Sequence, residues 1–106
     1  MDNRKSEKIK AIIQEAAAQF FELESNRTSL LTVTRVEMTE RGRKAIIFIT
    51  IFPDDKEADA LEFAKRKRTE LREFLIKKTK LSLVPFVDVV IDLGEKNRQR
   101  LDLLKV

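Results

Sequence analysis

The residues of this sequence most able to do chemistry are the basic side chains crowded between Ala64 and Lys80. This segment has eight cations against two acids, so its net charge is +6 while that of the whole chain is +4. Ion pairs along one helix contribute only about 0.2–0.5 kcal/mol each, and two acids cannot neutralise eight cations. An unneutralised cluster of this size favours a polyanion such as nucleic acid, although a solvated helix face is the simpler alternative. The candidate nucleic-acid-binding residues are therefore Lys65, Arg66, Lys67, Arg68, Arg72, Lys77, Lys78 and Lys80.

Two smaller groups of charged residues have both a functional and a structural interpretation. Arg41, Arg43 and Lys44 lie at a predicted turn, where they are candidates for an additional RNA contact or simply keep the turn soluble. Asp54 and Asp55 could hold magnesium, but adjacent aspartates before a helix more commonly cap it. We therefore expect no metal site.

Residues on the second predicted strand suggest a protein contact. If Ala45 and its alternate neighbours face the helices, then Ile46, Phe48 and Phe52 face outward and could dock a partner chain. The alternative is that the first helix or the C-terminal tail covers them. Asp88 and Asp92 lie on one face of the last strand, and we interpret them as solvated rather than as an acid–base pair.

The residue types that are missing restrict the function further. The chain of 106 residues has no His, Cys, Tyr or Trp, so the commonest general base, the thiolate ligands and any disulfide are excluded. Two glycines cannot build a glycine-rich phosphate loop or a GxxG clamp. We predict a non-enzymatic protein with no cofactor and no small-molecule substrate. A pI of about 9.5 favours an anionic partner, and the lack of a long apolar run favours the cytoplasm over a membrane.

The first half of the chain predicts one helix followed by a hairpin. Apolar residues recur at helical spacing over 7–23, and the loop 25–29 follows. The segments 30–38 and 44–52 are β-branched and read as strands joined by a turn at 39–43. The second strand is apolar at nearly every position, which is typical of a strand buried on both faces.

The second half predicts a broken helix and a third strand. Asp54 and Glu57 have the spacing of a capping box, so a helix should begin near Lys56. On a continuous helix Lys65, Arg68 and Arg72 would project together, but Arg68 would then lie on the apolar stripe. We therefore expect a break or kink at 67–69. A strand follows at 87–92, and Gly94 ends it.

The order of predicted elements, α-β-β-α-(kink)-α-β, indicates an α+β fold, and it resembles the arrangement of a single type II KH-like domain. A three-stranded sheet packs on helices and no GxxG loop is present. Residues 1–94 form this RNA-binding domain, and residues 95–106 form a C-terminal tail that is either a docked turn or loose.

Several segments together resemble the bacterial ribosome-binding factor A family over almost the whole chain. The opening helix and the hairpin LLTVTRVEMTERGRKAIIFIT resemble the family's, with Thr32, Val33, Thr34, Val36, Ala45, Ile47 and Thr50 on matching positions. The segment ELREFLIKKTKLSLVPFVDVVID resembles a second family region through Leu71, Arg72, Leu81, Val84, Pro85, Val87, Val89 and Asp92. RLDLL near the C-terminus resembles the family's ending.

The resemblance implies a ribosome assembly factor. Members of the family bind the immature small (30S) ribosomal subunit and its 16S rRNA, assist late maturation and rRNA processing, and matter most in cold adaptation. They carry a helix kink around a small residue, where this chain has Lys67, Arg68 and Thr69. The expected partners are therefore the small subunit and its rRNA, bound by a protein that is monomeric when free. The alternative from the residues is a small protein-interaction module that uses Ile46, Phe48 and Phe52.

Overall fold

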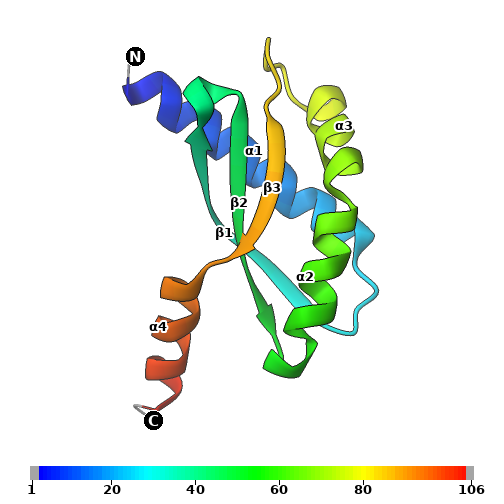
Figure 1. The fold of residues 1–106 in the computed structure, drawn as a ribbon, viewed down its shortest axis with the longest axis vertical. Coiled ribbons are helices and arrows are strands. Elements are labelled where there is room, and N and C mark those ends of the chain that lie inside the picture. The colour runs from blue at the N-terminus through cyan, green and yellow to red at the C-terminus, as the bar shows by residue number, and fades with distance from the viewer. Residues whose placement is uncertain (1–2, 105–106) are drawn as a thin grey trace.

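The apolar stripe near the N-terminus forms a long helix, and the β-branched segments after it form a hairpin, as the sequence predicts. The computed structural model describes residues 3–104 (Figure 1). In chain order the elements are α1 (Asn3–Glu24), β1 (Leu30–Thr39), β2 (Lys44–Phe52), α2 (Glu57–Arg66), α3 (Arg68–Lys78), β3 (Phe86–Ile91) and α4 (Leu93–Leu104), with 3-10 turns at Glu40–Gly42 and Asp54–Lys56. The predicted α+β class and the order of the first six elements are confirmed, and α4 is an additional helix.

The three strands form one mixed sheet in the order β1-β2-β3. β1 and β2 are antiparallel, and the register shifts between Val33 and Arg35. β3 returns beside β2 and runs parallel to it, with Lys44 opposite Phe86. A parallel return needs a crossover, and α2 and α3 supply it.

Helices α1, α2 and α3 cover one face of this sheet. Buried residues from all three helices and all three strands form a single core, in which Ile13, Ile47, Ile49, Leu71, Leu75 and Val89 are fully buried. α1 packs on β1 and α3, while α2 and α3 pack on β3. Figure 1 shows α1 crossing behind the sheet with α2 and α3 at its side.

Burial along β2 alternates from Lys44 to Ile49, so this part of the strand is not buried on both faces, whereas Ile49, Thr50 and Ile51 are all buried. Ala45, Ile47, Ile49 and Ile51 face the core, whereas Ile46 and Phe48 are only half-buried. The helices cover one face, and an antiparallel hairpin can leave the other face open to water. On that open face, Ile46 and Phe48 are partly covered by neighbouring side chains of the sheet and not by a helix.

The turns between elements follow the sequence only in part. The hairpin turn contains Gly42 at a φ of 85°, preceded by Glu40 and Arg41 at 54° and 58°. This left-handed conformation suits glycine, and the predicted turn is confirmed. The capping box at Asp54 is wrong, because the chain makes a 3-10 turn first and α2 begins at Glu57 without a side-chain cap.

Most of the predicted tail forms α4, which Figure 1 shows extending away from the sheet. Two ion pairs tie it to the start of α2. The Nζ of Lys96 lies 2.7 Å from Glu57, and an Nη of Arg100 lies 2.9 Å from Asp54. The four leucines of α4, Leu93, Leu101, Leu103 and Leu104, are exposed. Residues 105–106 lie outside the described residues.

Candidate nucleic-acid interface

The basic segment is divided by a helix break at Lys67. Lys67 has a φ of −91° and a ψ of 8°, and its N–H donates to the carbonyls of Phe63 and Ala64. α3 then begins at Arg68, so the predicted break is confirmed. A continuous helix would direct the Arg68 guanidinium toward the core, where an unpaired charge is costly. The break turns the Arg68 guanidinium away from the core.

Arg68 turns toward the open face of the sheet and reaches β3. One Nη lies 3.2 Å from Oδ1 of Asp88, and its Nε donates to the Lys65 carbonyl at 2.9 Å. The Nζ of Lys44 lies 3.9 Å from the other oxygen of Asp88. Asp88 thus joins a cation at the helix break to a cation near the hairpin tip. The interpretation of Asp88 as merely solvated is incomplete.

Arg72 lies against an exposed aromatic ring one turn further along α3. Its guanidinium carbon lies 4.4 Å from the centroid of the Phe86 ring, and an Nη donates to the Val84 carbonyl at 3.1 Å. Its Nε is buried and finds no acceptor within residues 3–104. Phe86 itself is 65% exposed. Arg72 is therefore held in place beside a ring face, a geometry in which arginine both carries charge and supports stacking.

Two shallow hollows connect these cations into one surface, which we call the basic interface. The first hollow, of about 420 Å³, is lined by Ala58, Leu61, Glu62, Lys65, Arg66 and Arg68. The second, of about 350 Å³, is lined by Arg68, Thr69, Arg72, Glu73, Phe86 and Val87. Arg68 belongs to both hollows. Lys65, Arg68 and Arg72 therefore share a surface, although the helix that would have aligned them is broken.

The other predicted cations differ in how much charge they leave unpaired. Lys67 is turned toward α1, with its Nζ 3.0 Å from Glu70 and 4.0 Å from Glu24. Arg66 forms a long contact of 3.9 Å with Glu62, and both side chains are well exposed. Lys77, Lys78 and Lys80 are exposed at the end of α3 and beyond, and no carboxylate among residues 3–104 lies within 4.0 Å of them.

The hairpin tip lies at the same end of the sheet as the second hollow. The N–H of Phe86 donates to the carbonyl of Arg43 at 2.9 Å, which fixes the tip beside the start of β3. Arg41 and Arg43 are exposed, and Lys44 is half-buried through its contact with Asp88. The tip cations are therefore close to the basic interface, which the sequence alone did not indicate.

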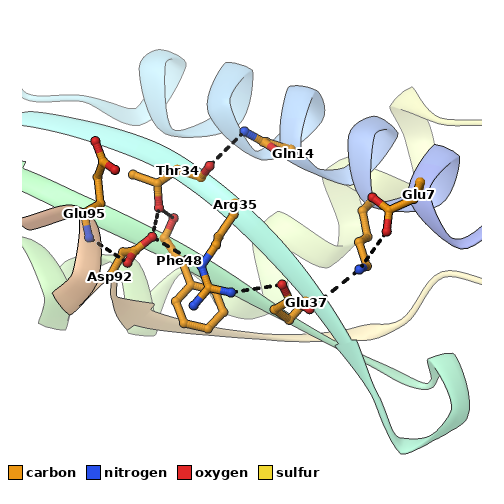
Figure 2. Close-up of polar contacts among 9 residues, drawn as sticks. Glu7, Gln14, Thr34, Arg35, Glu37, Phe48, Asp92 and Glu95 are labelled. Atoms are coloured by element: carbon orange, nitrogen blue, oxygen red, sulfur yellow. Dashed lines mark hydrogen bonds and ion pairs between the residues drawn. The ribbon is translucent and has the colours of Figure 1, made fainter. Parts of the chain in front are cut away.

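Phe48 on the open sheet face is covered by a cation rather than by a helix. The guanidinium carbon of Arg35 lies 3.7 Å from the centroid of its ring. Figure 2 shows Arg35 between Glu37 and Asp92, at 2.9 Å and 3.4 Å respectively. Phe52 differs, since it is 67% exposed beside the equally exposed Leu30 on β1. The three residues proposed for a protein contact thus have unequal exposure.

Asp92 is buried, so its interpretation as a solvated carboxylate is wrong. One oxygen accepts from the Thr34 hydroxyl at 2.6 Å, and the other accepts from the N–H of Glu95 at 3.1 Å (Figure 2). The Thr34 hydrogen bond, the Glu95 N–H and the charge of Arg35 together hold the pKa of Asp92 below its usual value of 3.8, against the opposing effect of burial. Asp92 is the N-cap of α4 and fastens that helix to the sheet.

We expect Asp92→Ala to loosen α4 selectively. Loss of an N-cap lowers stability by about 0.5–2 kcal/mol, so the amides of α4 should exchange hydrogen faster while those of β2 stay protected. Because the native pKa is depressed, the carboxylate stabilises the fold above about pH 4 and this contribution disappears as the pH falls through the native pKa. Asp92→Asn should lack this acid-dependent component. Equal exchange rates in wild type and Asp92→Ala would contradict this role.

Residues 3–104 contain no group of three acidic, His or Cys side chains arranged to hold a metal ion. Asp54, one of the two aspartates considered for magnesium, is instead paired with Arg100. None of the helices described has the length and apolar composition that a membrane crossing requires.

Comparison with known proteins identifies relatives of this fold. The family model for ribosome-binding factor A matches residues 3–104. The crystal structure of ribosome-binding factor A from Thermus thermophilus is similar, with a TM-score of 0.69, 24% identity, and coverage of 79% of this chain and 92% of that chain. A Thermus thermophilus homology model fitted into a cryo-EM map of a 30S–RbfA complex has a TM-score of 0.66 at 21% identity, covering 76% and 88%. No curated protein sequence matches significantly.

Proposed function

Because the chain belongs to the ribosome-binding factor A family, we propose that it binds the immature small ribosomal subunit and its 16S rRNA, and that it assists late maturation without acting as an enzyme. One similar protein is represented in a complex with the 30S subunit, which supports this partner. At the level of residues, the observation that carries the proposal is the basic interface, where Lys65, Arg66, Arg68 and Arg72 line two hollows that meet at Arg68.

The basic interface has the chemistry that folded RNA requires. Lysine and arginine can neutralise phosphates, and phosphate contacts position a protein without reading sequence. Selectivity then comes from the shape of the rRNA and from unpaired bases that stack on flat groups. The exposed ring of Phe86 with Arg72 behind it offers one such group. The hairpin tip, with Arg41 and Arg43, lies close enough to extend the contact.

The proposed function also implies where the protein acts, what it requires and how many copies bind. A ribosomal subunit as partner implies a cytoplasmic protein. The contact needs no cofactor and no small-molecule substrate, and one copy of the chain presents the whole basic interface.

We expect binding to purified small subunits to depend steeply on salt. If about five phosphate contacts form, the slope of log affinity against log salt concentration is about −4. The measurement compares small subunits with an unrelated RNA duplex at two salt concentrations. Strong preference for subunits with a steep slope supports the proposal. Equal and weak binding to the subunits and to the duplex would contradict the proposal, because a basic surface without selectivity binds any RNA in this way.

A second candidate function is protein docking through the open sheet face. The exposed pair of Phe52 and Leu30, at 67% and 65%, favours it. Docking of this kind would depend little on salt and would be lost in Phe52→Asp. Phe48 is a poorer test position because Arg35 already covers its ring.

A further inference from the structure

A third hollow lies on the opposite side of α2 from the first one. It has a volume of about 280 Å³ and is bounded by one face of α2 and by the loop 25–29 that joins α1 to β1. Figure 1 shows this loop running beside α2. We call this third hollow the loop hollow. The sequence gives no sign of it, since its walls come from segments about 30 residues apart.

The walls of the loop hollow combine an apolar floor with a charged rim. The floor consists of Phe21, Leu31, Ala60 and Phe63. The rim carries Lys56 from the preceding 3-10 turn and Asp59 and Arg66 from α2. On α2, Asp59, Phe63 and Arg66 are spaced by four and three residues, and Ala60 lies three residues before Phe63, so these four residues share one helix face. The loop adds the hydroxyl and amide groups of Ser25, Asn26, Thr28 and Ser29.

The loop wall is held by its own hydrogen bonds. The N–H of Arg27 donates to the Ser25 hydroxyl oxygen, and the N–H and hydroxyl of Thr28 both donate to Oδ1 of Asn26, at 3.1 Å and 2.7 Å. A wall fixed in this way loses little conformational entropy when a ligand binds.

Arg66 joins the loop hollow to the basic interface. It lines both the loop hollow and the first hollow, one on each side of α2. Its contact with Glu62 is 3.9 Å long between two exposed side chains, and such pairs contribute only about 0–1 kcal/mol. The guanidinium is therefore available to a phosphate that passes over α2.

We propose that the loop hollow binds one unstacked nucleotide of the RNA held at the basic interface. Its base lies against Phe63 with an amino edge toward Asp59, and its phosphate lies between Lys56 and Arg66. The volume is near the lower limit of roughly 300–1,000 Å³ for small-molecule sites, which suits one nucleotide. The rim presents two cations and one carboxylate, which match the phosphate and the amino edge of a nucleotide, whereas an apolar side chain of a protein partner would use only the floor. This inference rests on the proposed function.

The first test uses GMP, ribose 5-phosphate and inorganic phosphate as probes. Each is titrated into the full chain while amide resonances are followed by NMR. We expect GMP to shift the amides of 25–31 and 56–66 most strongly, because ribose 5-phosphate lacks the base and inorganic phosphate lacks both the base and the sugar. Equal shifts for GMP and ribose 5-phosphate, or no shifts around the loop hollow, would overturn the inference.

The second test uses variants and whole RNA. Phe63→Ala should weaken binding to small subunits by about 10-fold, as expected when one stacked base is lost. Because Phe63 is half-buried, Lys56→Gln serves as a second variant at an exposed position. It should lower the affinity for subunits several-fold without disturbing the fold, and it should weaken the binding of GMP, measured from the amide shifts, by a similar factor. Lys8→Gln is the matched control, since Lys8 is exposed on α1 and lines none of the three hollows; it should leave both the affinity for subunits and the GMP shifts unchanged.

The outcomes separate this inference from the proposed function. Suppose that wild type binds subunits with a steep salt dependence and that Phe63→Ala and Lys56→Gln bind them equally well. The inferred nucleotide site is then wrong, and the proposed function stands. If the variants weaken binding to subunits but not to deproteinised 16S rRNA, the occupant is a protein and the inference is overturned. If wild type shows no preference for subunits, the proposed function itself fails, whatever GMP does.

Discussion

Replacing Leu71 by alanine is expected to lower the free energy of unfolding by about 2–5 kcal/mol. Leu71 is fully buried on α3, within the core shared by α1 and the sheet. The substitution removes three carbons and leaves a cavity that the rigid sheet cannot close. Because domains of this size are stable by only about 5–15 kcal/mol, this is a large share of the total. Urea unfolding followed by circular dichroism measures the change.

Ile76→Ala is the matched control for this experiment. Ile76 is an aliphatic residue on the same helix but is 51% exposed, so its truncation should change stability by roughly 0.5 kcal/mol or less. Both substitutions put alanine at a helical position, so helix propensity is not what distinguishes them. Equal losses in Leu71→Ala and Ile76→Ala would mean that α3 does not pack on the core through Leu71.

The helix break shows what a sequence can predict about the candidate site. The apolar stripe of the second helical segment is interrupted at Arg68, and this single conflict between charge and periodicity was enough to predict the break. Burial rules of this kind are local and strong. The ion-pair partner of Arg68 could not be predicted in the same way. Asp88 lies 20 positions further along the chain, and only the position of β3 in the sheet brings it close to Arg68.

The two Asp-x-x-Glu patterns show where local patterns mislead. Asp54 and Asp92 are each followed by a glutamate three residues later, and only the first pattern was interpreted as a helix start. In the structure the second pattern caps a helix, while the first begins a 3-10 turn. The 92–95 pattern was the available signal for α4. This signal is ambiguous in the sequence, because Gly94 lies inside it and indicates the end of a strand equally well.

The open sheet face shows a limit of a different kind. Alternation correctly placed Ile46 and Phe48 away from the helices. Alternation could not show that Arg35 covers Phe48, because that contact depends on the shift in register between Val33 and Arg35. A one-residue shift in register decides which side chain of β1 lies opposite a given residue of β2.

The double variant Lys65→Glu/Lys77→Glu is expected to bind small subunits about 10²-fold more weakly than wild type at low salt. Both side chains are exposed and pair with no carboxylate among residues 3–104, and Lys77 lies one turn beyond Glu73 of the second hollow. Arg68 and Arg72 are poorer choices, since one pairs with Asp88 and the other supports Phe86. Losing two phosphate contacts should also reduce the magnitude of the salt slope by about 2.

The control for this double variant is Lys5→Glu/Lys8→Glu, which changes the net charge by the same amount. Lys5 and Lys8 are exposed at the start of α1, which Figure 1 shows across the molecule from α2 and α3. If the basic interface holds the RNA, the control keeps most of its affinity and its slope, because exposed charges more than about 10 Å apart are largely screened at 0.1 M salt. If both double variants lose affinity equally, the overall charge of the protein attracts the subunit and the hollows beside α2 and α3 have no special part in binding.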